Sequence, residues 1–399
     1  MVFLEKNNVM ISHISVENFM RLENCQEIPL GPLTLLVGQN GSGKSSVLKA
    51  IHWASRCASL AQAKKLSVEL MDFVPSVDFR LLAHRSTLQG RDRGGSSTKP
   101  VIVTFRRDVE TGSIKLKSLG NNAGVSVEVE GNVAADFVKE EPQTAYIPGL
   151  AGLAEHETIL AAPVFRRKAA SGDGGSVLRQ MLLNTHSDEM NTGPEGVELN
   201  RLSELVGQVI PGVRFWVKFD QRRDAFIQAW FYTPDMKYGV GGSNYATMRR
   251  PLEMAGTGLL QVTQIFAYLL TFRPRLLLID EPDAHLHQSS QERLVSALGA
   301  ALRSFPETQI MVSTHSPRIV RVAGQLTKVV WLENGAIRGQ GAEVRERMGW
   351  GALDKDIVLF SEDDNTEYLQ SIIDQWPHLA HRTVIWPCFG VSSIPDGER

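Results

Sequence analysis

Cysteine is scarce in this chain of 399 residues. Its three cysteines, Cys25, Cys57 and Cys388, lie far apart, and such a small odd set argues against both a disulfide framework and a zinc site. We therefore expect a reducing, cytoplasmic setting. An excess of charge of one sign is also lacking, since the formal net charge is −2. Any contact with DNA or RNA would thus need a local basic face or a partner.

Long apolar runs are missing as well. The sequence has no stretch of about 18 apolar residues, so we expect no membrane span. The opening residues include Glu5 and no long apolar segment, which argues against a secretory signal. Sustained heptads are absent too, so a long coiled-coil arm is not expected. The length of the chain favours two or more lobes.

The apolar segments that are present alternate between strand and helix patterns, and they predict an α/β fold. Strands are expected within 11–37 and 101–130, as a hairpin over 213–233, and at 275–280, 309–315 and 328–335. Helices are expected over 44–60, most of 139–200 and 258–272. The polar stretch 84–100 is rich in Gly and Ser, and it predicts a loop.

A glycine-rich motif joins the strand ending near Val37 to the helix after it, and it fits the phosphate-binding pattern G-x-x-x-x-G-K-[ST]. Glycines permit positive φ and let backbone N–H groups surround an anion, and the helix start adds a positive dipole end. We expect Lys44 to reach the β- and γ-phosphates of ATP and the Ser45 hydroxyl to ligate Mg²⁺. The predicted nucleotide contacts are Gly38, Gln39, Asn40, Gly41, Ser42, Gly43, Lys44, Ser45 and Ser46.

Two further motifs supply the remaining chemistry of phosphoryl transfer. The apolar strand "LLLID" ends in Asp280 and is followed by Glu281. We expect Asp280 to hold Mg²⁺ and Glu281 to polarise the attacking water. His315 follows the buried strand "QIMVST", where an imidazole could contact the γ-phosphate. The alternatives are a solvated acidic strand end and a structural histidine.

These motifs resemble the ABC-type ATPases of the SMC and RecF-like group, most closely the OLD (overcoming lysogenization defect) family. The resemblance rests on the opening segment "ISVENFMRLENCQEIPLGPLTLLVGQNGSGKSSVLKAI", on "LLLIDEPDAHLH" and on "QIMVSTHSP", and it covers about 11–340. It implies an ATPase head that sandwiches ATP between two copies, in an ATPase domain over 1–345. Lys44 and Asp280 lie 236 residues apart, so we expect an insertion at about 100–205, partly β-rich and partly helical.

The resemblance also implies a loop that contacts the nucleotide of the other subunit. Gly256, Thr257 and Gly258 match it loosely at a predicted helix start, with Thr257 as a plain N-cap as the alternative. It further implies a nucleotide contact for Arg21 and a glutamine loop, for which Gln143 is a weak candidate.

The C-terminal segment 355–399 reads as strand, helix and strand, and it resembles the start of a Toprim domain, either partial or vestigial. Glu362 would be its acid, or alternatively a solvated cap of the helix that begins near Asn365. A Toprim nuclease needs a further acidic cluster, and nothing between Glu362 and Arg399 supplies it. We therefore predict no nuclease activity from this chain alone.

Two basic clusters are candidates for contacts with nucleic acid or protein. Arg91 and Arg93 form one, and Arg166, Arg167 and Lys168 form the other. Solvated loops are the simpler interpretation for both. Interleaved aromatic residues, which would indicate a stacking surface, are not evident around them.

The sequence as a whole favours an ATP-hydrolysing switch that needs Mg²⁺. ATP would close a homodimer, or a larger homo-oligomer, of heads. The resemblance implies control of a protein effector in DNA-directed or antiphage defence. One alternative is a DNA repair or chromosome-maintenance ATPase that grips duplex DNA directly. A second is a nucleotide-dependent sensor and scaffold with little turnover.

Overall fold

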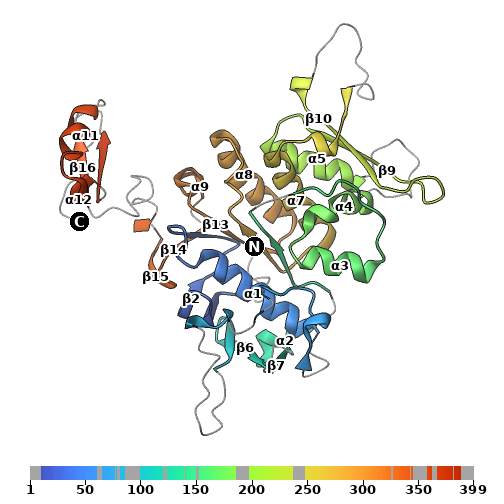
Figure 1. Ribbon diagram of the computed structural model, residues 1–399, viewed down its shortest axis with the longest axis horizontal. Coiled ribbons are helices and arrows are strands. Elements are labelled where there is room, and N and C mark those ends of the chain that lie inside the picture. Colours follow the sequence, from blue (N-terminus) through green and yellow to red (C-terminus); the bar gives the residue numbers. More distant parts are fainter. Residues whose placement is uncertain are drawn as a thin grey trace, which may run out of the picture.

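A computed structural model describes the chain over 10–60, 65–76, 78, 81–85, 99–119, 124–139, 141–149, 152–185, 197–236, 248–324, 327–341, 343–344, 357–361, 366–380 and 382–387. The fold is α/β, as predicted, and it is built around one mostly parallel sheet (Figure 1). Within the described ranges, no helix is both long and apolar enough to cross a membrane.

The central sheet has six strands in the order β15-β14-β3-β13-β12-β8. All neighbours are parallel except β14 and β15. The strands are β3 (Leu33–Val37), β8 (Thr144–Ile147), β12 (Leu276–Asp280), β13 (Gln309–Thr314), β14 (Lys328–Glu333) and β15 (Ala336–Gln340). Every residue of β3, β12 and β13 is buried, which explains why β3 and β12 are nearly continuous apolar runs and why β13 has an apolar centre.

Alternate residues of the central strands enter two different cores. Leu35 and Leu277 pack into one core with α7 (Thr257–Phe272) and α8 (Gln288–Ser304). Leu36 and Leu278 pack into the other core with α1 (Lys44–Ser59). The sheet is therefore covered by helices on both faces, and α1 and α7 lie on opposite sides of it (Figure 1).

A second, antiparallel sheet packs against α1. Its order is β2-β1-β5-β6-β7-β4, and its strands are β1 (His13–Phe19), β2 (Leu22–Pro29), β4 (Lys65–Leu66), β5 (Val101–Arg107), β6 (Glu110–Ser118) and β7 (Val125–Glu130). The short helix α2 (Asn132–Ala135) follows. The β-rich part of the expected insertion thus pairs directly with the N-terminal strand β1. Long-range pairing of this kind leaves no local mark in the sequence.

The rest of the chain before β16 is mixed. It contains α3 (Ala162–Ala170), α4 (Leu178–Asn184), α5 (Val197–Val209) and α9 (Pro317–Val322). The predicted hairpin is confirmed as β9 (Arg214–Lys218) and β10 (Gln228–Tyr232), and β11 (Arg250–Pro251) extends it. The prediction that most of 139–200 is helical was wrong, because β8 and residues 152–161, which form neither helix nor strand, precede α3 and α4, and residues 186–196 lie outside the described ranges. A four-residue apolar strand cannot be told from a helix turn by periodicity.

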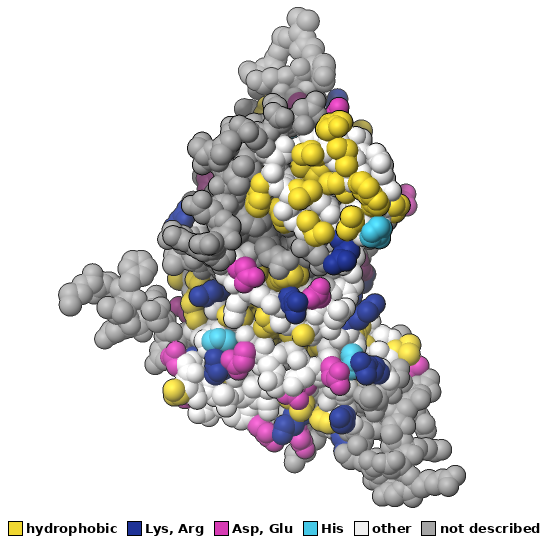
Figure 2. Space-filling model, turned by 90° about the vertical axis from the view of Figure 1, so that its left-hand side faces the viewer, with side chains coloured by type: hydrophobic (Ala, Val, Ile, Leu, Met, Phe, Trp, Pro, Cys, Tyr) yellow, Lys and Arg dark blue, Asp and Glu magenta, His cyan; other side chains and the backbone are white. Residues whose placement is uncertain are grey.

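The predicted C-terminal β-α-β unit is confirmed as secondary structure. It comprises β16 (Ile357–Ser361), α11 (Glu367–Ile373), α12 (Pro377–Ala380) and β17 (Thr383–Pro387), with β16 parallel to β17. Figure 2 faces this unit and shows apolar side chains gathered on its surface; Leu359, Tyr368 and Trp376 are exposed. Its resemblance to a Toprim domain stays a prediction. Glu362, Arg91, Arg93 and Cys388 lie outside the described residues.

Candidate functional site

The phosphate-loop motif lies between the end of β3 and the start of α1, as predicted. Gly38 has φ 151°, and a Cβ there would lie 2.3 Å from the carbonyl oxygen of Leu332. Gly43, the N-cap residue of α1, is left-handed with φ 110°. Only glycine tolerates both constraints without strain, so the loop conformation requires the glycines of the motif.

Lys44 is 3% exposed and lies inside the loop that precedes it. Its Nζ donates hydrogen bonds to the carbonyl oxygens of Gly38, at 2.7 Å, and Gln39, at 2.9 Å. Burial lowers the pKa of Lys44, and the nearby carboxylates of Glu281 and Asp280 oppose that shift. An ammonium group held at the loop among backbone carbonyls can exchange them for phosphate oxygens when an anion enters.

Asp280, the last residue of β12, is hydrogen-bonded to residues of α1, β8 and β13. Its Oδ1 accepts hydrogen bonds from the hydroxyls of Ser45, at 2.8 Å, and Ser313, at 2.5 Å, while its Oδ2 accepts one from Tyr146 at 3.0 Å. Parallel strands bring their carboxyl ends to one edge, so β8, β12 and β13 all supply residues here. Burial, together with the Asp280 carboxylate, raises the pKa of Tyr146, so the phenol stays a donor.

Hard oxygen ligands from Ser45 and Asp280 suit Mg²⁺, which prefers oxygen and keeps several waters. The donor set therefore fits the predicted ion: a hydroxyl and a carboxylate, already 2.8 Å apart, at the mouth of the phosphate loop. Metal binding would require the Ser45 proton to turn away from Asp280. Ser313 and Tyr146 would then keep the carboxylate oriented.

Glu281 follows Asp280 in a constrained backbone conformation. Its φ of 46° is left-handed, which costs a non-glycine residue about 1–3 kcal/mol. Its backbone N–H donates to the Ser313 hydroxyl oxygen at 2.9 Å, and its side chain is one-third exposed. The turn therefore directs the Glu281 carboxylate out of the strand and toward solvent, where a water could be bound.

His315 lies between two acids. Its Nδ1 is 3.9 Å from the Glu281 Oε1, and its Nε2 is 3.8 Å from the Asp283 Oδ2. Both separations are within ion-pair distance and are too long for hydrogen bonds. Asp283 is buried, burial raises its pKa, and its Oδ1 has no hydrogen-bond partner within the described part of the chain.

Arg21 lies where the sequence places it, close to the phosphate loop. A Cβ on Gly41 would be 3.7 Å from an Arg21 guanidinium nitrogen. Arg21 lines a polar cleft of about 170 Å³, together with residues 39–42 of the loop, Leu332 of β14 and Asn334 of the β14–β15 turn. The cleft has the position and polarity to take the part of a nucleotide that extends beyond its phosphates.

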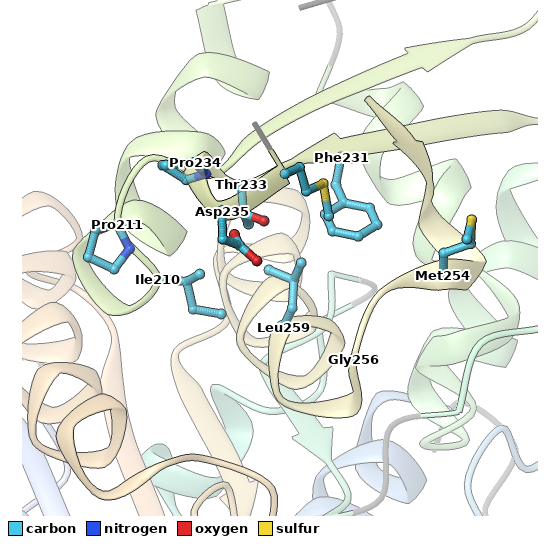
Figure 3. A pocket seen from close by; sticks show the side chains of 10 residues that line it. Ile210, Pro211, Phe231, Thr233, Pro234, Asp235, Met254, Gly256 and Leu259 are labelled. Atoms are coloured by element: carbon cyan, nitrogen blue, oxygen red, sulfur yellow. The ribbon is translucent and has the colours of Figure 1, made fainter. Parts of the chain in front are cut away.

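Gly256, Thr257 and Gly258 stand at the N-terminus of α7. Gly256 is the N-cap and Thr257 the first helical residue, so the alternative that Thr257 caps this helix was wrong. Gly256 and Thr257 are exposed, and the cleft beside the phosphate loop is lined by other residues. Gly256 instead borders an open, largely apolar hollow of about 600 Å³ with Met254 and Leu259 (Figure 3).

Gln143 is not brought to the site. Its carbonyl accepts a hydrogen bond from the N–H of Leu276, which begins β12. Asp280 ends the same strand, about 13 Å away along the strand axis. Gly149, two residues after the end of β8, lies at the site instead, because a Cβ there would be 3.0 Å from the Asp280 carbonyl oxygen and 3.4 Å from the Glu281 Cβ.

Three polar residues of the site were missed by sequence reasoning. Tyr146 lies in the strand that was read as helix, and Ser313 lies two residues before His315. Asp283 follows Asp280 by three residues, within the motif "LLLIDEPDAHLH". Ser313 and Asp283 lie inside motifs that predict the site, so the sequence could have indicated them. No pattern in the sequence indicates Tyr146.

Comparisons with known proteins agree with the resemblance read from the motifs. Residues 10–68 match a family model described as an AAA ATPase domain. Residues 244–321 match one described as an AAA domain, putative AbiEii toxin, Type IV TA system. The chain is similar to the OLD nuclease of Thermus scotoductus. The two are 23% identical over 335 residues, which cover 77% of this chain and 59% of that protein.

The chain is also similar to two other proteins, one by sequence and one by structure. The DNA replication and repair protein RecF of Pseudoalteromonas atlantica is 24% identical over 160 residues, which cover 40% of this chain and 36% of RecF. An SMC head bound to the C-terminal winged-helix domain of ScpA aligns with a TM-score of 0.49 at 12% identity, over 84% of this chain and 99% of that one. The chain spans about three-fifths of the OLD nuclease and about a third of RecF.

Proposed function

We propose that this chain binds ATP with Mg²⁺ and hydrolyses it. The observation that carries the proposal is the hydrogen bond between Ser45 and Asp280, which are 235 residues apart. It joins the phosphate loop to the strand-end acid in the arrangement that phosphoryl transfer needs. Matches to ATPase family models at 10–68 and 244–321 support the same activity.

Each residue has a role in this proposal. The loop amides and Lys44 hold the triphosphate, Ser45 and Asp280 hold Mg²⁺, and Glu281 polarises the attacking water. His315 contacts the γ-phosphate, and Arg21 contacts the nucleotide from the cleft beside the loop. The metal supplies charge neutralisation at the β- and γ-phosphate oxygens when it is bound.

A second copy of the chain completes the site in this proposal. Gly256 and Thr257 lie exposed, and Gly258 partly exposed, at a helix N-terminus, where amide groups suit phosphate oxygens. They are not among the residues that line the chain's own phosphate-loop cleft, so they are free to face the nucleotide of a partner copy. ATP would then join two heads, and hydrolysis would separate them.

The biological role of ATP hydrolysis is proposed from the similarity to the OLD nuclease and to RecF. Similarity to a protein named OLD nuclease favours control of an effector that acts on nucleic acid. The resemblance of the motifs to the OLD family favours DNA-directed or antiphage defence, and the scarcity of cysteine favours the cytoplasm. An ATPase domain over 1–345 would drive a Toprim-like segment over 355–399 or a separate protein partner. The RecF match favours the second candidate, a repair ATPase that binds duplex DNA directly. Salt-dependent DNA binding by the isolated chain would favour that candidate.

Steady-state turnover tests the proposal. The wild-type chain should hydrolyse ATP only with Mg²⁺, and Glu281→Gln should lower kcat by about a hundredfold or more while keeping ATP bound. ATP should shift Glu281→Gln toward dimers in size-exclusion chromatography with light scattering. Glu307→Gln, an exposed acid remote from the site, is the matched control. Normal turnover by Glu281→Gln would remove this residue from the proposed role.

A further inference from the structure

One side chain of α8 bridges two turns of the proposed site. Gln291 lies in the first turn of this helix. Its Nε2 donates to the carbonyl oxygens of Asp283, at 3.1 Å, and Leu286, at 3.0 Å, in the turn that follows β12. Its Oε1 accepts from the hydroxyl of Ser316, the residue after His315, at 2.7 Å. The Gln291 amide therefore connects the turn after β12 to the turn after β13.

Helix α8 gives Gln291 a fixed base. Leu294 and Val295 follow it by three and four residues, on the same side of the helix, and both are buried in the core. The end of the side chain is held by three hydrogen bonds and its base by a packed helix. A supporting residue of this kind restricts the geometry of the groups that it holds. Gln291 thus sets the separation of the two turns.

The backbone around His315 is fixed by the same contacts. Thr314 and Ser316 are buried, whereas the imidazole between them is half exposed. The Ser316 N–H donates to the Thr314 hydroxyl oxygen at 3.0 Å, and the Ser316 side chain also caps the N-terminus of α9. The imidazole projects from this backbone to within 3.9 Å of Glu281 and 3.8 Å of Asp283. Its position relative to the two acids therefore depends on Ser316 and on the amide that Ser316 binds.

We propose that Gln291 is a positioning residue for ATP hydrolysis, which holds His315 at the separation from Glu281 that the γ-phosphate end of the site requires. The proposal rests on the function proposed above and adds a residue that acts through His315. A displacement of about 1 Å can cost a factor of a hundred in rate, so support of this kind affects the chemical step. ATP binding would persist without it, because Lys44 and Ser45 are held by other contacts.

Two substitutions of Gln291 test this role. Gln291→Ala removes all three hydrogen bonds. Gln291→Glu keeps the shape of the side chain and can accept from Ser316, but a carboxylate cannot donate to the two backbone carbonyls. This second variant decides the test if Gln291→Ala does not fold. Glu292→Gln is the matched control, because Glu292 is the next residue of α8 and instead pairs with Arg318, at 3.5 Å, and Arg321, at 2.9 Å, of α9.

Steady-state kcat and KM for ATP, and equilibrium binding of a fluorescent ATP analogue, are measured on the full chain. Both Gln291 variants should lower kcat about tenfold, and KM and analogue affinity should change less than about twofold. Glu292→Gln should keep the wild-type kcat. In a His315→Ala background, the Gln291 substitutions should lower kcat by less than a further factor of about two, because Gln291 acts through His315.

Three results would overturn the role of Gln291 and leave the ATPase proposal intact. The first is a wild-type kcat in Gln291→Glu. The second is a full tenfold loss in the His315→Ala background, since Gln291 would then act without the histidine. The third is an equal loss of analogue affinity and kcat, which indicates a general disturbance of the site. Absence of ATP binding and turnover in the wild-type chain would instead overturn this role together with the proposed function.

Discussion

Acidification provides a test of how α1 is held in place, through the buried histidine His52. Its Nε2 lies 2.9 Å from the carbonyl oxygen of Ala170, which can only accept, so Nε2 carries the proton. Its Nδ1 therefore accepts from the Thr144 hydroxyl at 2.8 Å. One neutral imidazole thus joins the helix after the phosphate loop to β8 and to the end of α3.

Burial lowers the pKa of His52 from 6.5 to about 4, and the hydrogen bond to Ala170 opposes this shift only in part. Between pH 6.5 and about pH 4, His52 is protonated in the unfolded chain and neutral in the folded chain. The stability that His52 contributes is therefore complete above pH 6.5 and is lost as the pH falls toward 4. The difference corresponds to about 3 kcal/mol, at about 1.4 kcal/mol per pH unit.

The assay is the free energy of urea unfolding at several values between pH 7 and pH 4.5, for the wild type and for His52→Gln. Subtracting the two curves isolates this one group, because all other titrations are shared. We expect the wild type to lose about 1.4 kcal/mol more per pH unit than His52→Gln below pH 6.5. His285→Gln, at an exposed histidine, should keep the wild-type slope. Equal slopes for the wild type and His52→Gln would refute the reasoning.

Two further substitutions probe the site itself. Tyr146→Phe should raise the Mg²⁺ concentration needed for half-maximal turnover about tenfold in a Mg²⁺ titration, because Asp280 loses a hydrogen-bond donor that orients it. Tyr268→Phe is the control and should not change that concentration, because the Tyr268 hydroxyl donates to a backbone carbonyl instead. Gly38→Ala should lower the free energy of unfolding by about 2 kcal/mol, because its Cβ meets the Leu332 carbonyl in a left-handed backbone. Gly299→Ala, with open space in mid-helix, should match or exceed the wild type in the same denaturation assay.

The sequence predicted the parts of the site that depend on local pattern. The loop between β3 and α1 requires glycines for its backbone, and the buried strands β3 and β12 are apolar except for Thr34 and Asp280, while β13 has an apolar centre. Both features are formed by adjacent residues, so both are visible in one sequence.

What the sequence did not predict depends on contacts between distant segments. Tyr146 reaches Asp280 only because β8 pairs with β12. The sequence of a short apolar strand does not indicate which strand it pairs with. The pairing of β5 with β1 and the hydrogen bond from Arg179 to Glu253 are of the same kind. Gln143, the candidate for the glutamine loop, precedes β8 and lies beside the start of β12 instead of its Asp280 end, which could not be known before the pairing of the two strands was seen.

Equilibrium binding of ATP with Mg²⁺ tests the central claim most directly. Isothermal titration of the wild type, of Lys44→Ala and of Lys49→Ala, a second lysine on the same helix, separates the role of the loop ammonium from that of general positive charge. The account predicts micromolar-range binding by the wild type and by Lys49→Ala, and at least about a hundredfold weaker binding by Lys44→Ala. Equal affinity of Lys44→Ala and the wild type would contradict it.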